Sequence, residues 1–267
     1  MSDRSAIEWT SATWNPTTGC DQVSRGCDNC YALTLAKRLR AAGNPRYQHD
    51  GNPRTSGPGF GLTLHPDKLK DPLHWRRPRL VFVNSMSDLF HGEVPDAFIR
   101  RVFEVMSQAR QHSFQVLTKR PGRMASVLRR LQPDPLPNVW LGTSVEDQRW
   151  ATIRIPKLLE TPAAIRFLSC EPMLGPIDLS PWLWGLDWII AGGESGPGFR
   201  PMEASWPRAI RDQCREGSVP FFFKQWGGRT PKAGGRQLDK RTWDEMPSRG
   251  SVRSGSGSWA ESSPVGV

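Results

Sequence analysis

The segment LVFVNSMSD, residues 80–88, begins with four apolar residues and ends in a mainly polar stretch that closes with Asp88. A short run that is apolar throughout is typical of a parallel strand buried on both faces, because a strand with one wet face alternates. Residues 96–111 follow with apolar side chains at helical spacing. This order predicts a βα unit whose strand carries polar groups at its carboxyl end.

The same alternation continues towards residue 223. Further strands are expected at residues 114–118, 139–142, 165–168, 188–191 and 219–223, and further helices at 122–131, 147–159 and 203–217. Strands that alternate with helices form right-handed βαβ units and a parallel sheet. With one more strand just ahead of residue 15, about seven are expected. The sequence therefore predicts an α/β fold with a complete or partial (β/α) barrel, and an open doubly wound sheet is the alternative.

Residues 1–227 are expected to form this single α/β domain. Residues 43–78 interrupt it with an irregular insertion rich in Pro and Gly, in which only a short strand near 61–64 is expected. Long loops in compact domains are often functional, and this one is placed to cover the cysteines that precede it. Residues 228–267 are polar and glycine-rich, which predicts a largely disordered tail.

Composition narrows the class of protein. The 267 residues carry a formal net charge of +10, and the isoelectric point is near 9.9. Such a charge favours a polyanionic partner, a nucleic acid or nucleotide, and an arginine-rich solvated surface is the alternative. Five cysteines, three of them clustered, are not typical of a secreted disulfide framework. No apolar run approaches membrane-spanning length, so a cytoplasmic protein without a membrane partner is expected.

Three cysteines lie within eleven residues in the spacing C-x6-C-x2-C, on a loop that a helix-like run, residues 32–42, follows at once. Three thiolates suit a soft metal centre, either iron–sulfur or zinc. Structural zinc takes four protein ligands, whereas a three-cysteine cluster leaves one iron open. His49, Cys170 and Cys214 are possible fourth ligands, but each is isolated and distant in sequence. The residues alone leave an iron–sulfur cluster, a zinc ion and a metal-free loop open.

The residues around these cysteines carry a resemblance to known families. Residues 15–20 (NPTTGC) and 27–32 (CDNCYA) resemble the cluster loop of radical SAM enzymes near spore photoproduct lyase. Together with residues 7–10 (IEWT), they are also similar to the three-Cys-motif phage and prophage proteins, a family without an assigned reaction. The chain departs from the radical SAM pattern in a first gap of six residues, where three are usual, and in Asn29, where an aromatic residue is usual.

The resemblance implies a barrel of the radical SAM type and a specific chemistry. A 4Fe–4S cluster would be bound by Cys20, Cys27 and Cys30, and S-adenosylmethionine would bind its open iron. A one-electron reductant would then allow cleavage to methionine and a 5′-deoxyadenosyl radical, which abstracts a substrate hydrogen. Cys170 is a candidate hydrogen-atom donor, as a cysteine is in photoproduct lyase. A buried, small apolar cysteine is the alternative.

Polar residues that directly follow the predicted strands supply the other candidates, because active sites of parallel barrels lie at the carboxyl ends of the strands. They are Asp88, Lys119, Ser144, Glu171, Glu194 and Lys224. The resemblance also matches Ser85 to Asp88, Thr118-Lys119 and the Gly-Gly-Glu that holds the amino group of S-adenosylmethionine, here Gly192, Gly193 and Glu194. Outside a barrel, Gly-Gly-Glu indicates only a turn.

These considerations assign roles to the candidates. Catalytic roles are expected for Cys170, Lys119 and Asp88. Cofactor binding is expected for Ser85, Ser144, Glu171, Gly192, Gly193 and Glu194. The expected function is a radical-SAM-like iron–sulfur enzyme that repairs or modifies a nucleic acid or nucleotide. The alternatives are a metal-cluster nucleic-acid-binding protein without this chemistry, and a radical enzyme with a peptide or small-molecule substrate.

Overall fold

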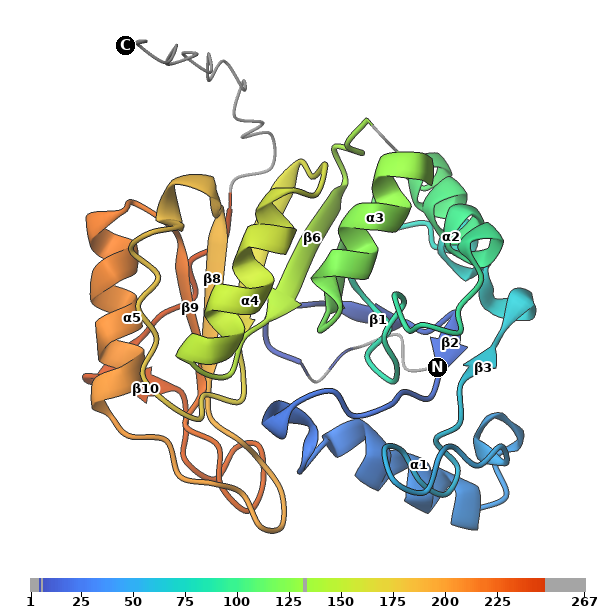
Figure 1. The fold of residues 1–267 in the computed structure, drawn as a ribbon, viewed down its shortest axis with the longest axis horizontal. Helices are drawn as coiled ribbons and strands as arrows, with labels where there is room; N and C mark the ends of the chain where they lie inside the picture. The colour runs from blue at the N-terminus through green and yellow to red at the C-terminus, as the bar shows by residue number, and fades with distance from the viewer. Residues whose placement is uncertain (1–4, 6, 132–133, 248–267) are drawn as a thin grey trace, which may run out of the picture.

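The computed structural model describes residues 5, 7–131 and 134–247, and seven strands within these form one parallel sheet (Figure 1). The strands are β1 (Ala12–Trp14), β4 (Leu80–Val83), β5 (Ser113–Thr118), β6 (Val139–Ser144), β7 (Ile165–Cys170), β8 (Trp188–Gly192) and β9 (Phe221–Gln225). They lie side by side in chain order, each parallel to the next. An order that never reverses has no topological switch point, so the doubly wound alternative is wrong. The outer strands β1 and β9 do not pair within the described residues, and the sheet is a curled half barrel.

Four helices connect successive strands and cover the convex face of the sheet (Figure 1). They are α2 (Asp96–Gln108), α3 (Pro121–Leu131), α4 (Gln148–Leu159) and α5 (Ser205–Glu216). Each new strand is added on the same side of the previous one, and right-handed crossovers then place every connecting helix on the same face of the sheet. The β7–β8 connection contains only a one-turn 3₁₀ helix at Leu183–Gly185. Helix α1 (Tyr31–Ala41) lies apart from this layer, below the carboxyl ends of the strands (Figure 1).

Alternate side chains of the strands enter two separate cores. Val81 and Val83 face the helices, whereas Phe82 between them joins an aromatic cluster on the concave face. The cluster consists of Trp9, Phe82, Trp140, Ile165, Phe167, Trp188, Ile190 and Phe222. Trp188 lies at its centre, with its ring centroid 5.7–6.2 Å from four other aromatic rings. Most of these side chains lie near the amino ends of their strands, so the cluster fills the concave face at that end.

The insertion packs against the cysteine loop, as its position suggested. Its short strand β3 (Thr63–Leu64) pairs antiparallel with β2 (Thr17–Thr18), directly before Cys20. The backbone N–H of Cys20 donates to the carbonyl of Phe60 at 3.2 Å. The insertion also contains one-turn 3₁₀ helices at Pro45–Tyr47, Pro66–Lys68 and Asp71–His74, and the cysteine loop contains another at Arg25–Cys27.

The folded domain extends beyond the expected boundary at residue 227. Strands β10 (Gln237–Leu238) and β11 (Arg241–Thr242) form a small hairpin beside β9. Leu238 and Trp243 are buried, and the backbone N–H of Phe223 donates to the Trp243 carbonyl at 2.9 Å. Two apolar anchors thus hold a segment whose composition predicted a tail. The rest of that predicted tail, residues 248–267, lies outside the described residues. Among the described helices, none has the length and apolar character needed to cross a membrane.

His112 makes the fold sensitive to acid. Its side chain is buried, Nδ1 accepts a hydrogen bond from the backbone N–H of Arg79 at 3.1 Å, and Nε2 donates to the Pro72 carbonyl at 3.1 Å. Burial lowers the pKa of His112 in the folded chain, so the unfolded chain binds a proton first. We expect the free energy of unfolding to fall as pH decreases below about 6.5, the usual histidine pKa.

Urea titrations at a series of pH values would measure this dependence in His112→Gln and in His74→Gln, a control at an exposed histidine. The slope should be smaller in His112→Gln and unchanged in the control. An unaltered slope in His112→Gln would contradict the assignment.

Candidate functional site

A cavity of about 580 Å³ opens at the carboxyl end of the concave face. Its apolar floor is formed by Trp9, Phe82 and Leu117, where the aromatic cluster ends. Its walls combine strand ends with the cysteine loop and two later loops. The polar and loop residues that line it include Gly26, Asn29, Cys30, Lys119, Ser144, Ser169, Glu171, Gly193, Glu194, Lys224 and Lys232.

The three clustered cysteines lie on the loop that borders this cavity. All are free and half-buried, and Cys20 and Cys30 pack against the apolar cluster that includes Ala36 and Phe60. Within the described ranges, no three His, Cys, Asp or Glu side chains converge closely enough to hold one metal ion. Ligands of a single zinc must converge, whereas the thiolates of a cubane bind different irons. The described residues thus contain no ready-made single-ion site at the cysteine loop.

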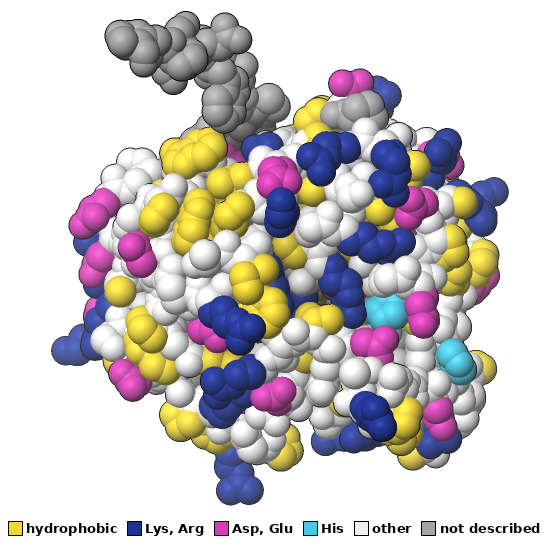
Figure 2. Space-filling view, viewed as in Figure 1, with side chains coloured by type: hydrophobic (Ala, Val, Ile, Leu, Met, Phe, Trp, Pro, Cys, Tyr) yellow, Lys and Arg dark blue, Asp and Glu magenta, His cyan; other side chains and the backbone are white. Residues whose placement is uncertain are grey.

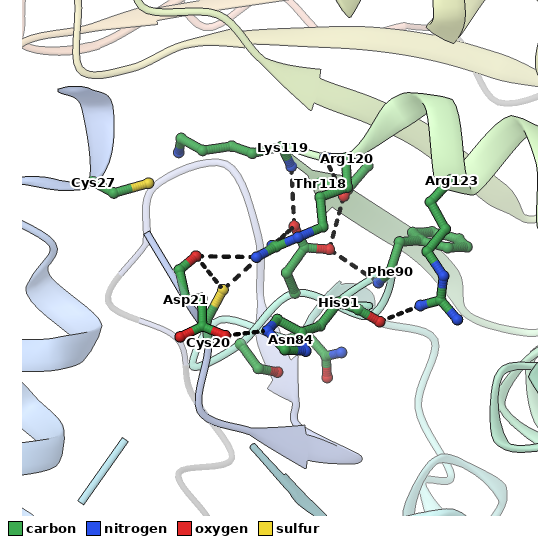
Figure 3. A network of polar contacts seen from close by, with 12 residues as sticks. Cys20, Asp21, Cys27, Asn84, Phe90, His91, Thr118, Lys119, Arg120 and Arg123 are labelled. Atoms are coloured by element: carbon green, nitrogen blue, oxygen red, sulfur yellow. Dashed lines mark hydrogen bonds and ion pairs between the residues drawn. The ribbon is translucent and has the colours of Figure 1, made fainter. Parts of the chain in front are cut away.

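Cys20 is in contact with a buried ion pair. The Nη1 atom of Arg120 lies 3.5 Å from the Cys20 Sγ and 2.9 Å from a carboxylate oxygen of Asp88 (Figure 3). Asp88 also accepts from the Thr118 hydroxyl at 2.7 Å and from the backbone N–H groups of Phe90 and Lys119. Both carboxylate oxygens of Asp88 are thus engaged in holding Arg120 and the strand end.

The environment of Cys20 keeps its thiol protonated. Burial and the Asp88 carboxylate raise the pKa of Cys20 to about 12, while the Arg120 guanidinium acts in the opposite direction. Next to it, the Asp21 carboxylate accepts from Thr55 at 2.6 Å and lies 2.8 Å from His91 Nε2. A metal bound at Cys20 would displace the thiol proton, because thiolates are the ligands.

A second buried ion pair supports the middle of the cysteine loop. Glu146 and Arg154 are 2.8 Å apart, and their side chains are 0% and 2% exposed. The other Glu146 oxygen accepts from the backbone N–H of Gly26 at 3.4 Å. Arg154 also lies over the Trp150 ring, 4.0 Å from its centroid. The loop between Cys20 and Cys27 thus rests on a charge pair carried by the end of β6 and helix α4.

Glu194 fastens the loop from the opposite side. Its Oε2 accepts from Asn29 at 2.9 Å and from the backbone and Nε of Arg200 at 2.8 and 3.0 Å. The Nη1 of Arg200 continues to Asp28 at 3.0 Å. Burial opposes ionisation of Glu194, but these hydrogen bonds outweigh it and hold its pKa below the usual value. Glu194 therefore connects β8 to the residues between Cys27 and Cys30.

Of the two glycines before Glu194, one has a packing reason. A Cβ on Gly193 would lie 2.0 Å from the carbonyl oxygen of Trp226, so only glycine fits there. Gly192 lies beside an ion pair across the end of β8, in which the Lys224 Nζ and a Glu171 oxygen are 2.6 Å apart, and a Cβ there would make only ordinary contacts. Lys119 also lines the cavity, and its ammonium has no partner among the described residues. Figure 3 shows the Lys119 side chain extending away from Arg120.

The family model for proteins of unknown function DUF5131 matches residues 4–247. The chain belongs to the DUF5131 family. This match confirms the expectation that the chain belongs to a family without an assigned function. Neither a curated protein nor a solved structure matches the chain. The phage and radical SAM affiliations stay predictions.

The DUF5131 fold brings most of the predicted site residues together, but not all. Cys30, Lys119, Ser144, Glu171, Gly193 and Glu194 line the cavity. Ser85 lies elsewhere, where its hydroxyl exchanges hydrogen bonds with Asn15 at 3.2 Å. Asp88 is buried beneath Arg120, which makes it a positioning residue for that arginine. Cys170 is fully buried in the core under the helices and does not line the cavity. A hydrogen-atom donor would have to face the cavity.

Several residues of the DUF5131 site escaped sequence reasoning. Arg120, next to the predicted pair Thr118-Lys119, was expected only as one of the basic residues of a phosphate-contacting surface, and its contact with Cys20 was not predicted. Asn29 was noticed only as a departure from the radical SAM pattern, and it proves to be the contact for Glu194. Glu146 and Arg154 carried only weak signals. Glu146 is a charged residue two positions beyond a strand end, and Arg154 is a cation on the apolar side of a helix. Arg200 carried no signal.

Proposed function

We propose that the chain is an iron–sulfur enzyme of the radical SAM kind that acts on a nucleic acid or nucleotide. The observation that carries the proposal is the placement of three free thiols on one loop at the carboxyl end of a half barrel, beside a cavity of about 580 Å³. In parallel barrels this end is where the active sites lie. The resemblance of residues 15–32 to a cluster loop supplies the chemical class.

The residues present fit a cluster. Cys20, Cys27 and Cys30 would hold it, and the apolar packing around Cys20 and Cys30 gives it a dry setting. When bound together with S-adenosylmethionine, such a cluster supplies one-electron cleavage of the sulfonium and a carbon-centred radical for hydrogen abstraction. The protein contributes loop anchoring through Glu146 and Glu194, and it provides a cavity whose floor excludes water.

The walls of the cavity are suited to a flat ligand with polar edges. Trp9 and Phe82 provide faces on which an aromatic ring can stack. The Lys224–Glu171 pair places a donor and an acceptor side by side at one wall, and the hydroxyls of Ser144 and Ser169 lie at the same depth of the sheet. The Lys119 ammonium brings a positive charge to the cavity, which attracts a carboxylate or phosphate. A nucleobase with its phosphate combines these features.

The surface charge supports a polyanionic substrate. In Figure 2, many Lys and Arg side chains lie on the face that carries α3 and α4, with Asp and Glu side chains among them. Some of this charge is compensated, since Arg123 and Arg130 both pair with Asp96 at 3.2 and 2.6 Å. Binding of a short oligonucleotide should therefore weaken steeply as salt rises, because phosphate contacts release counterions. Absence of binding at low salt would redirect the substrate search to peptides and small molecules.

Anaerobic iron and sulfide analysis with EPR of the reduced protein, with and without S-adenosylmethionine, tests the assignment. We expect a cubane signal that changes when S-adenosylmethionine is added and is lost in the combined Cys20→Ser, Cys27→Ser, Cys30→Ser variant. Cys214→Ala, a change at a buried cysteine of α5, should leave the signal intact. Bound zinc, or a protein without iron, would contradict the proposal.

One observation favours a second candidate. Glu194 is fully engaged by Asn29 and Arg200, so it does not offer the carboxylate that Gly-Gly-Glu presents to S-adenosylmethionine in radical SAM enzymes. A metal-cluster nucleic-acid-binding protein without this chemistry needs no such carboxylate. In the EPR experiment this candidate predicts a cluster whose signal is the same with and without S-adenosylmethionine.

A further inference from the structure

We propose that Arg120 sets the reduction potential of the metal centre held by Cys20, by donating a charge-assisted hydrogen bond to the ligand sulfur. The inference rests on the proposed function, because it requires an iron–sulfur centre at the cysteine loop. It concerns a residue that lies outside the cavity lining and that no part of the cluster motif contains.

The guanidinium of Arg120 is fixed in this position by contacts on three sides. Nη1 lies 3.5 Å from the Cys20 Sγ and 2.9 Å from Asp88, and Nη2 donates to the backbone carbonyl of Asp21 at 3.0 Å. Its backbone N–H also donates to the Thr118 hydroxyl at 2.8 Å. With the side chain only 16% exposed, the cation is largely withdrawn from water. A guanidinium held this firmly near sulfur is pre-organised to act on that sulfur.

The electrostatic effect has a definite sign. Reduction adds one negative charge to an iron–sulfur centre, and part of that charge resides on the ligand sulfurs. A nearby cation and an N–H donor stabilise the reduced form more than the oxidised form, which raises the potential. The Asp88 carboxylate opposes this effect, because its negative charge also acts on Cys20, although its hydrogen bond is to Arg120 and not to the sulfur. Removal of Arg120 and removal of the Asp88 charge should therefore shift the potential in opposite directions.

The neighbouring arginine provides a matched control. Arg123 lies one turn further along, on α3, and its guanidinium donates to the carbonyl groups of His91 and Val94 and to Asp96. Figure 3 shows it directed away from Cys20. Replacing Arg123 by glutamine removes the same charge from the same region without touching the sulfur.

The test is a potentiometric titration of the reconstituted protein with dithionite and redox mediators, followed by EPR. We expect Arg120→Gln to shift the midpoint potential to a more negative value, Asp88→Asn to shift it to a more positive value, and Arg123→Gln to leave it unchanged. Arg120→Lys keeps the positive charge but loses the planar guanidinium with its several N–H donors. Its midpoint potential should therefore shift in the same direction as that of Arg120→Gln, by a smaller amount. This second variant keeps the test open if Arg120→Gln fails to hold the centre.

Failures of the two proposals are distinguishable. A reducible centre whose potential is the same in the unsubstituted protein, Arg120→Gln and Arg120→Lys overturns the inference and leaves the proposed function standing. An equal shift in Arg120→Gln and Arg123→Gln also overturns it, because net charge alone would then explain the change. Absence of any reducible centre in the unsubstituted protein overturns the proposed function, and this inference with it.

Discussion

Gly19→Ala should lower the free energy of unfolding by about 3 kcal/mol or more and displace Cys20 from its position. Gly19 has φ +86°, a conformation that L-residues rarely adopt. A Cβ at this position would lie 2.1 Å from the carbonyl oxygen of Gly61 and 2.7 Å from that of Phe60. Both contacts are with backbone, so no side-chain rotation can relieve them. The insertion would have to move away from the loop that it covers.

Substitutions at two other glycines distinguish the cost of the backbone conformation from the cost of the steric clash. Gly43 has φ +71°, but no atom of the described residues lies within 4 Å of the place that a Cβ would take, so Gly43→Ala measures the cost of the conformation alone, about 1–2 kcal/mol. Gly122 lies within α3 with the same open space beside it, and Gly122→Ala should stabilise the helix by about 0.5–1 kcal/mol. Urea titrations give all three values. A Gly19→Ala variant no less stable than Gly43→Ala would show that the predicted clash is not present.

Arg154→Met should lower the free energy of unfolding by about 3–5 kcal/mol, because it leaves the Glu146 carboxylate buried without its cation. Glu146 is 0% exposed, and its only other donor among the described residues is the long contact from Gly26 at 3.4 Å. The uncompensated charge would either unfold the region or take up a proton. Because Glu146 supports the loop between Cys20 and Cys27, the proposed metal centre should also be held less firmly.

The double variant Arg154→Met, Glu146→Leu provides the comparison. Removing both charges avoids the isolated carboxylate, so the double variant should be more stable than Arg154→Met alone. Arg149→Met is the control, since Arg149 is exposed and also lies over the Trp150 ring, with its guanidinium carbon 5.6 Å from the centroid. Its effect should stay within about 0.5 kcal/mol. Chemical denaturation measures all three, and a double variant less stable than Arg154→Met would contradict the argument.

The sheet was predictable because its strands are buried on both faces and separated by amphipathic helices. Residues 114–118, 139–142 and 188–191 were expected as strands, and each lies within an observed strand. The hairpin after β9 was not predictable. It depends on Leu238 and Trp243 within a polar, glycine-rich segment, and two anchors without periodicity do not reveal a fold.

The residues that line the candidate site could be predicted from the positions of the strand ends. The sequence did not show which face of the sheet each side chain points to. Successive residues of a strand point to opposite faces, so Cys170 enters the core under the helices while Glu171 lines the cavity. When a strand is apolar on both faces, its sequence does not show which of its alternate residues face the cavity and which face the helices. The contacts between Glu194 and Asn29 join residues from opposite ends of the chain, and no local pattern indicates such a pairing.

The consecutive order of the strands has a consequence for how the protein is made. From β5 onward, each new strand pairs with the one synthesised just before it, so the sheet can grow at its latest edge while the chain leaves the ribosome. The cysteine loop is made early, but its supports Glu146, Glu194 and Arg200 emerge much later. We therefore expect the loop to stay unanchored during most of translation, so that the proposed metal centre could form only on a nearly complete polypeptide.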